Sequence, residues 1–123
     1  MYHLTIHTQF AAAHNLIHYQ GDCENLHGHN WKVEATVCAR ELDRSGLAID
    51  FKILKRETKR ILELLDHKYL NEIKPFDQMS PSSENISRFI YEKLSEVLNN
   101  DNVRVERITV WESDNACASY TAD

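Results

Sequence analysis

The chain has 123 residues, 42% of them hydrophobic, which suits one domain, and no apolar run reaches the ~20 residues that a membrane span requires. Its formal net charge of −5 and its pI near 5.8 lack the basic footprint of nucleic-acid-binding proteins. The three cysteines have no paired spacing and no signal-peptide pattern precedes them, so we expect reduced thiols in a cytoplasmic protein.

Residues 2–13 and 26–40 are predicted to be the two strands of an antiparallel hairpin. In both segments apolar and polar residues alternate, as expected where one face of a sheet is buried. In the second strand, His27 and His29 have the parity of the apolar residues, which places both imidazoles on the core side. The connecting residues lack a clear periodicity, and a loop of this length in a compact domain usually has a function.

Two helices are predicted next. Asp50 is the expected N-cap of the first helix, which has an apolar stripe and runs to about Asp66. The second helix is expected to begin near Ser80, with Pro81 in its first turn. Two further strands follow, at residues 103–112 and 116–120. The order β-β-α-α-β-β indicates an α+β fold in which two helices pack on one face of an antiparallel sheet.

Histidines gather around the predicted hairpin. His27 and His29 share a strand face, and His14 lies just upstream of the loop. Three neutral imidazoles with an open fourth position form the ligand set of a catalytic zinc ion, whereas structural zinc usually takes four protein ligands, several of them cysteine. Cys23 lies on the loop, where a nearby dication would lower the pKa of its thiol. It is interpreted as a base or as a fourth ligand, with an inert thiol as the alternative.

Other acidic and basic positions have simpler explanations when each is taken alone. Asp66 and His67 are adjacent at the predicted end of a helix, where neighbouring side chains diverge by about 100° and need not form a hydrogen-bonded pair. Glu112 has the parity of the apolar residues in its strand, so its carboxylate needs an Arg or Lys partner or a ligand with two parallel N–H donors. Glu84 is explained by a favourable position in the first turn of a helix.

Six short motifs are spread along nearly the whole chain: FAAAH (10–14), CENLHGH (23–29), IDF (49–51), LDHKYLN (65–71), PSSE (81–84) and WE (111–112). Each motif is weak alone, but their order and spacing are specific. Together they resemble the family of 6-pyruvoyl-tetrahydropterin synthase and 6-carboxytetrahydropterin synthase. The short chain is more similar to the bacterial queuosine-pathway enzymes than to the longer animal pyruvoyl synthases.

The resemblance implies a tunnelling fold with the element order read above. It also implies trimers whose sheets join into a barrel, two trimers stacked as a homohexamer, and active sites at subunit interfaces. Zinc would be held by His14, His27 and His29. Cys23 would be the proton-transferring base, assisted by Asp66 and His67. Substrate contacts are implied for Glu112, which would anchor the two-donor edge of a pterin, and for Ser82, Ser83 and Glu84.

The implied substrate is 7,8-dihydroneopterin triphosphate, which the carboxytetrahydropterin branch converts with loss of triphosphate and acetaldehyde. Lys32, Lys68 and Arg88 are candidates for offsetting the negative charges of substrate and protein. Glu24 directly follows Cys23 and is a candidate branch determinant, since a glutamate three residues before His-Gly-His in some relatives diverts the substrate to 6-hydroxymethyl-7,8-dihydropterin. This folate branch, the pyruvoyl branch and a non-catalytic, metal-binding oligomeric module are the alternatives.

Overall fold

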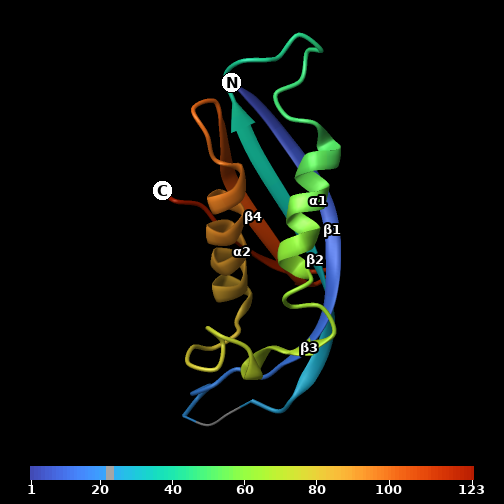
Figure 1. The fold of residues 1–123 in the computed structure, drawn as a ribbon. Coiled ribbons are helices and arrows are strands. Elements are labelled where there is room, and N and C mark those ends of the chain that lie inside the picture. The colour runs from blue at the N-terminus through green and yellow to red at the C-terminus, as the bar shows by residue number, and fades with distance from the viewer. Residues whose placement is uncertain (22–23) are drawn as a thin grey trace.

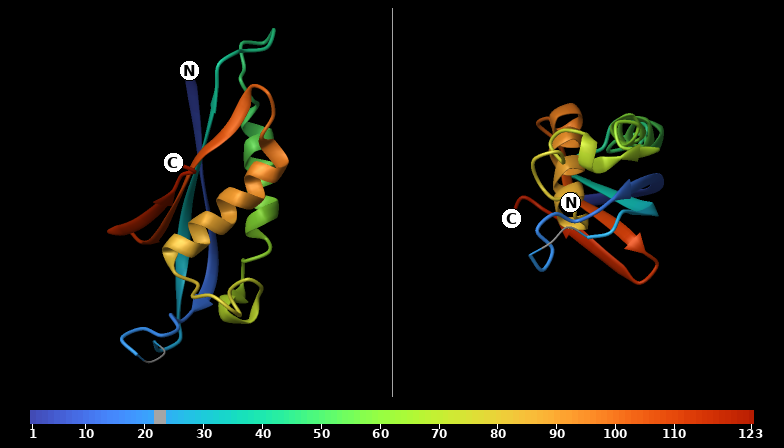
Figure 2. Two further views of the ribbon diagram at one scale, coloured as in Figure 1. Left: turned by 90° about the vertical axis from the view of Figure 1, so that its left-hand side faces the viewer. Right: turned by 90° about the horizontal axis from the view of Figure 1, so that it is seen from below.

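The computed structural model describes residues 1–21 and 24–123, which form one five-stranded sheet with both helices on the same face (Figures 1 and 2). The strand order across the sheet is β3-β1-β2-β4-β5. The elements are β1 (Tyr2–His14), β2 (His27–Ala39), α1 (Phe51–Leu62), β3 (Lys68–Tyr69), a 3-10 turn (Leu70–Glu72), α2 (Ser83–Leu98), β4 (Val103–Ser113) and β5 (Ala116–Tyr120). The α+β class and the order of the six main elements are confirmed.

The sheet is mixed, so the prediction of an antiparallel sheet was wrong in one place. β3 pairs in parallel with β1 through Ala12 and Ala13, while the other strand pairs are antiparallel. A two-residue strand is too short to show a hydrophobic alternation, which is why the sequence gives no sign of it. β3 holds the segment after α1 against the end of β1 that carries His14.

The first helix ends earlier than predicted. Its N-cap is Asp50, as expected, and the Asp50 carboxylate accepts the Lys52 N–H at 2.8 Å. The helix stops at Leu62 instead of continuing to about Asp66. The chain then tightens into turns and reaches His67, whose left-handed backbone (φ 57°) cannot continue a right-handed helix.

The second helix begins later than predicted. The Ser82 hydroxyl accepts the Asn85 N–H at 3.2 Å, which makes Ser82 the N-cap and leaves Pro81 outside the first turn. Among the described residues, no helix is long and apolar enough to cross a membrane.

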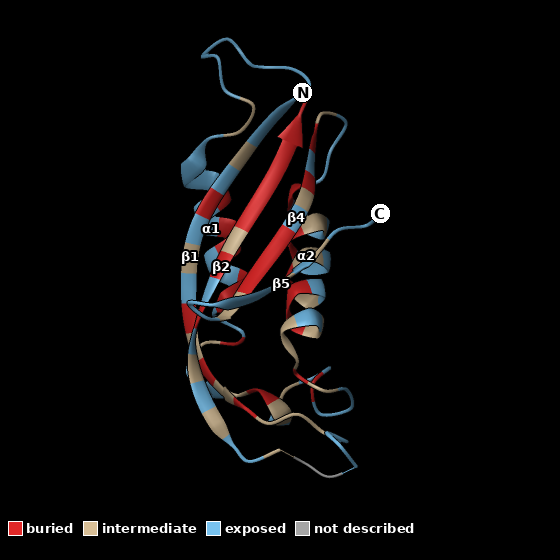
Figure 3. Cartoon of the chain, turned by 180° about the vertical axis from the view of Figure 1, so that it is seen from behind, coloured by how far each residue is buried: buried red, intermediate tan, exposed pale blue. Residues whose placement is uncertain are grey.

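The hydrophobic core lies between the two helices and the inner face of the sheet. Trp31, Val33 and Ala35 of β2 are fully buried, as their alternation predicts, and they pack in one cluster with apolar residues of both helices. Figure 3 shows long buried stretches in β2 and β4, whereas β1 and β5 at the sides of the sheet are more exposed.

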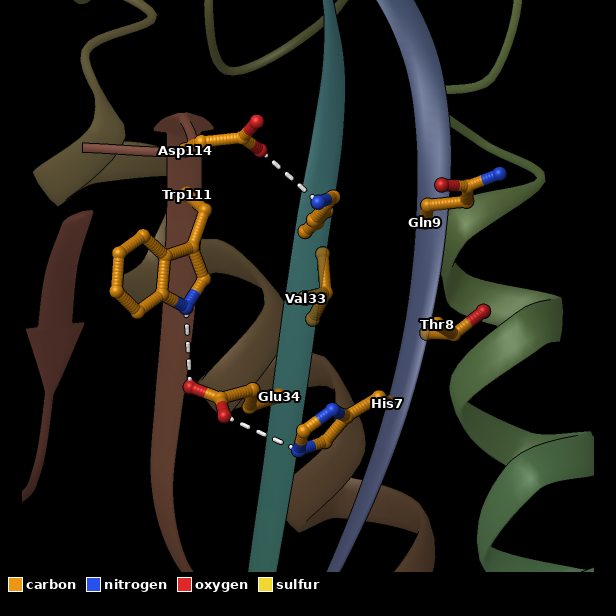
Figure 4. Close-up of a pocket in the computed structure, with 8 residues that line it drawn as sticks. His7, Thr8, Gln9, Val33, Glu34, Trp111 and Asp114 are labelled. Carbon is orange, nitrogen blue, oxygen red and sulfur yellow. Dashed lines mark hydrogen bonds and ion pairs between the residues drawn. The ribbon is translucent and has the colours of Figure 1, made fainter. Parts of the chain in front are cut away.

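The outer face of the sheet carries polar side chains. Glu34 accepts the Trp111 indole N–H at 3.0 Å and lies 3.1 Å from His7 Nε2, while Lys32 Nζ lies 2.9 Å from Asp114 Oδ1 (Figure 4). These groups line an open hollow of about 650 Å³. His27 and His29 occupy the same alternate positions of β2 as its core residues. They therefore lie on the opposite face of the sheet from this hollow.

Candidate metal centre

Three histidines at one end of the β1–β2 hairpin meet a carboxylate from β4. His14 and His27 are the last paired residues of the hairpin, and His29 follows on the same face of β2. One ligand atom from each histidine and one from Glu112 all lie within 4.8 Å of one another. The structure therefore brings together the predicted histidine trio and adds Glu112 as a fourth group.

Backbone carbonyls orient two of the imidazole rings. His14 Nδ1 lies 2.8 Å from the Pro81 carbonyl oxygen, and His27 Nδ1 lies 2.8 Å from that of Asn25. A carbonyl only accepts, so each Nδ1 carries the proton and each Nε2 of the neutral ring presents a lone pair. Hydrogen bonds of this kind commonly orient metal-ligating histidines.

The Nε2 atoms are arranged for a shared cation. Those of His14 and His27 are 3.1 Å apart, a separation at which two lone pairs repel. His29 Nε2 is buried and has no hydrogen-bond partner in the described part of the chain, although Glu112 Oε1 lies 3.1 Å away. Two ligands bound to zinc at ~2.05 Å with a tetrahedral angle are about 3.3 Å apart, so these residues fit a zinc ion.

The surroundings keep His29 in the form that binds a metal. Burial is the main reason that the pKa of His29 lies below its ordinary value; His14 and His27 add to the shift, and the Glu112 carboxylate opposes it. A lowered pKa keeps the imidazole neutral at pH 7. The indole of buried Trp31 packs edge-on against His14 and His29, with ring centroids 4.8 and 5.2 Å apart. The sequence identified Trp31 only as a core residue.

Glu112 lies on the inner face of β4, as its strand parity predicted, and its carboxylate meets the histidines there. Its Oε1 lies 3.4 Å from His14 Nε2 and 3.1 Å from His29 Nε2. An inward carboxylate could have been explained by an ion pair with Arg or Lys. Here the imidazoles of His14 and His29 take that place. Because the Glu112 side chain is 37% exposed, the carboxylate can be reached by a ligand from solvent.

Asp66 and His67 form the hydrogen-bonded pair that their adjacency alone did not predict. His67 Nδ1 lies 3.0 Å from Asp66 Oδ2, and Asp66 Oδ1 accepts the Ala11 N–H at 2.9 Å. The Ala11 hydrogen bond is the main reason that the pKa of Asp66 lies below its ordinary value. α1 ends at Leu62, so Asp66 and His67 lie beyond the helix and are not held about 100° apart on its surface.

A hollow of about 500 Å³ is lined by His67 and Lys68 and, on β2, by Gly28, His29 and Asn30. Of the three basic residues considered for the substrate phosphates, Lys68 lies here. The other two form ion pairs elsewhere, Lys32 with Asp114 and Arg88 with Glu92.

The remaining predicted site residues have mixed positions. Ser82 is the N-cap of α2, followed by Ser83 and Glu84 in its first turn. The Pro81 carbonyl on His14 places this segment directly beside the metal centre. Glu24 accepts the Leu16 N–H at 3.1 Å and lies 3.9 Å from His27 Nδ1. Cys23 lies outside the described residues.

Known proteins that resemble this chain establish its family. The sequence pattern of 6-pyruvoyl tetrahydropterin synthase matches residues 3–123. The chain belongs to this family. The solved structure of Caenorhabditis elegans 6-pyruvoyl tetrahydropterin synthase superposes with a TM-score of 0.86, covering 99% of this chain and 96% of that one at 24% identity. The tetrahydropterin synthase fold is thereby confirmed.

Relatives that carry the name of the carboxy-forming enzyme include two that are more than a third identical over most of this chain. A 6-carboxy-5,6,7,8-tetrahydropterin synthase of Synechocystis sp. is 37% identical over 92 residues, which are 71% of this chain and 70% of that protein. A protein of Archaeoglobus fulgidus with the same name, given provisionally, is 34% identical over 114 residues, 92% of this chain and 90% of its own. This tetrahydropterin synthase family member is thus a lyase with a three-histidine, one-glutamate metal-binding group.

Proposed function

We propose that this chain is a zinc-dependent 6-carboxy-5,6,7,8-tetrahydropterin synthase of queuosine and 7-deazapurine biosynthesis. It acts on 7,8-dihydroneopterin triphosphate and releases triphosphate and acetaldehyde. The observation that carries the proposal is the convergence of His14, His27, His29 and Glu112 at a site that solvent can reach. The names of the two relatives support the carboxy branch over the pyruvoyl branch.

The three histidines and Glu112 are the groups that would hold the zinc ion. When bound, zinc supplies Lewis acidity that makes the hydroxyls of the substrate's three-carbon side chain more acidic. The partly exposed Glu112 carboxylate is also proposed to accept the pterin 2-amino and N3–H donors, as a carboxylate accepts the fork of arginine. In this proposal Glu112 lies between the metal and the ring and orients one relative to the other.

Proton transfer is assigned to Cys23 and to the Asp66–His67 pair. Asp66 stays ionised because its pKa is lowered, and it holds His67 Nδ1 at 3.0 Å. This leaves His67 Nε2 to give a proton to the substrate or to take one from it. Cys23 is proposed as the second proton-transferring group, the base. Ser82, Ser83 and Glu84 are proposed to contact the substrate from the start of α2, and Lys68 to contact its phosphates.

The product decides among the branches. Incubation with 7,8-dihydroneopterin triphosphate, followed by mass analysis, should give 6-carboxy-5,6,7,8-tetrahydropterin and acetaldehyde. A 6-pyruvoyl product would assign the pyruvoyl branch, and 6-hydroxymethyl-7,8-dihydropterin the folate branch. A protein that binds zinc but converts no substrate would favour the metal-binding module.

We also propose a homohexamer built from two trimers, with active sites shared between chains. β3 covers β1 only at Ala12 and Ala13, so in the described structure most of β1 and the whole of β5 are open sheet edges. Open edges favour pairing with another chain, and a domain of this size has a small core of its own. Light scattering in dilute neutral buffer tests the assembly, and a monomer that turns over substrate would refute shared sites.

A further inference from the structure

The backbone leaves β1 after His14 through contacts with side chains instead of another strand. Three consecutive N–H groups each donate to a side chain from a different segment: Asn15 to Asn71 Oδ1 at 3.0 Å, Leu16 to Glu24 Oε1 at 3.1 Å, and Ile17 to Ser80 Oγ at 3.2 Å. Tertiary contacts therefore set the direction of the chain directly beside a metal ligand.

Asn71 makes the most complete of these contacts. Its Oδ1 accepts the Asn15 N–H at 3.0 Å, and its Nδ2 donates to the Asn15 carbonyl at 2.8 Å. One side-chain amide thus satisfies both backbone groups of Asn15, as a neighbouring strand would. The Tyr69 hydroxyl donates to Asn15 Oδ1 at 2.6 Å, so the side chain of Asn15 is held as well.

The same segment is attached to β1 on the other side of His14. Asp66 Oδ1 accepts the Ala11 N–H at 2.9 Å, and β3 pairs with Ala12 and Ala13. Residues 66–71 therefore contact the chain both before His14, in β1, and after it, at Asn15. His14 is itself buried, with Nδ1 on the Pro81 carbonyl, so a tilt of its backbone would move Nε2 away from His27.

We propose that Asn71 is a positioning residue of the metal centre. Its amide holds the peptide that follows His14 and so directs the His14 Nε2 lone pair toward the point shared with His27 and Glu112. The inference rests on the metal-binding part of the proposed function and is independent of the pterin product. Loss of a direct partner of a ligand ring, which for His14 is the Pro81 carbonyl, typically weakens metal binding about 10–100-fold, and Asn71 acts one step further out, through the backbone.

Asn71→Asp is the main test variant. It is nearly isosteric and keeps an acceptor for the Asn15 N–H, but it removes the Nδ2 donor and places a carboxylate against the Asn15 carbonyl. The zinc affinity of the purified protein, measured by competition with a chromophoric chelator, is expected to fall by up to about tenfold, the lower end of the loss seen for direct partners of a ligand. The visible spectrum of the cobalt-substituted protein is expected to change as well, because it reports the ligand geometry.

Asn102 offers a matched control. Its Oδ1 accepts the N–H groups of Arg40 and Glu41 at 3.1 and 2.9 Å, and its Nδ2 donates to the Glu41 carbonyl at 2.9 Å. This second amide clamp lies at the far end of β2, roughly 40 Å from His27 at about 3.3 Å per residue. Asn102→Asp should lower the melting temperature and leave zinc affinity and the cobalt spectrum unchanged.

The outcomes separate this inference from the proposed function. If the wild-type chain binds no zinc, the metal centre itself is refuted. If the wild type binds zinc and Asn71→Asp binds it equally well, or if Asn102→Asp weakens binding as much, the positioning role is overturned. Should Asn71→Asp fail to fold, Asn71→Ala removes both hydrogen bonds to the Asn15 backbone without adding a charge, and an unchanged zinc affinity in that variant overturns the inference.

Discussion

The Nε2 atoms of His14 and His27 face each other at 3.1 Å, although both rings already donate their Nδ1 protons to backbone carbonyls. Two neutral imidazoles in this arrangement direct lone pairs at each other, which costs free energy unless a cation lies between them or one ring takes a second proton. The fold thus holds the rings in advance in the orientation that zinc requires.

Replacing a histidine of the trio should remove the metal. His27→Ala and His29→Ala each take away one of three nitrogen ligands, so metal analysis of the purified variants should show near-complete loss of zinc. His7→Ala, on the outer face of the sheet, is the control and should keep wild-type zinc content. Full zinc occupancy in both ligand variants would refute the assignment.

Asp66 should make the folded protein sensitive to acid. Its pKa in the folded state lies below the ordinary value of 3.8, so its contribution to stability is present above that value and is lost as the pH falls through the folded-state pKa. The amide introduced by Asp66→Asn cannot titrate. Between about pH 5 and pH 3, wild type should therefore lose more unfolding free energy than this variant in urea titrations. Equal losses would show that Asp66 contributes nothing to the acid sensitivity.

Ser82 should contribute to stability as a helix cap, whatever its role with substrate. Ser82→Ala removes the acceptor of the Asn85 N–H and should lower the unfolding free energy by about 1 kcal/mol. Ser83→Ala, one residue later and inside the helix, is the control and should change it less. If the two variants are equally stable, the hydroxyl of Ser82 is not an effective cap.

Cys23 and Glu24 should divide the chemistry unequally. A thiol near zinc is readily a thiolate at neutral pH, so Cys23→Ala should abolish 6-carboxytetrahydropterin formation and leave zinc and pterin binding intact. Glu24→Ala should mostly spare that product and remove any 6-hydroxymethyl-7,8-dihydropterin. Product analysis by mass spectrometry distinguishes the variants. Retained carboxytetrahydropterin synthesis in Cys23→Ala, or its loss in Glu24→Ala alone, would reverse the roles and favour the folate branch.

Local sequence patterns were sufficient for the hairpin and for two of the ligands. Alternation with a period of two places His27 and His29 on the face of Trp31, and the structure confirms that face as the core side. Asp50 was recognised as an N-cap because capping involves neighbouring residues. Such features depend on interactions within a few residues, so they can be predicted from the chain alone.

Contacts between distant segments required the tertiary structure. Glu112 joins the histidines because β4 pairs with β2 in a register that sets Trp111 opposite Lys32, and no local pattern specifies that register. The Asp66–His67 pair depends on the early end of α1 and on the Ala11 N–H, from a strand far away in the sequence. The sequence by itself determined the order of the six main elements and the ligand types. The tertiary structure alone decided which groups meet at the metal, because their positions follow from packing and strand register between segments distant in the chain.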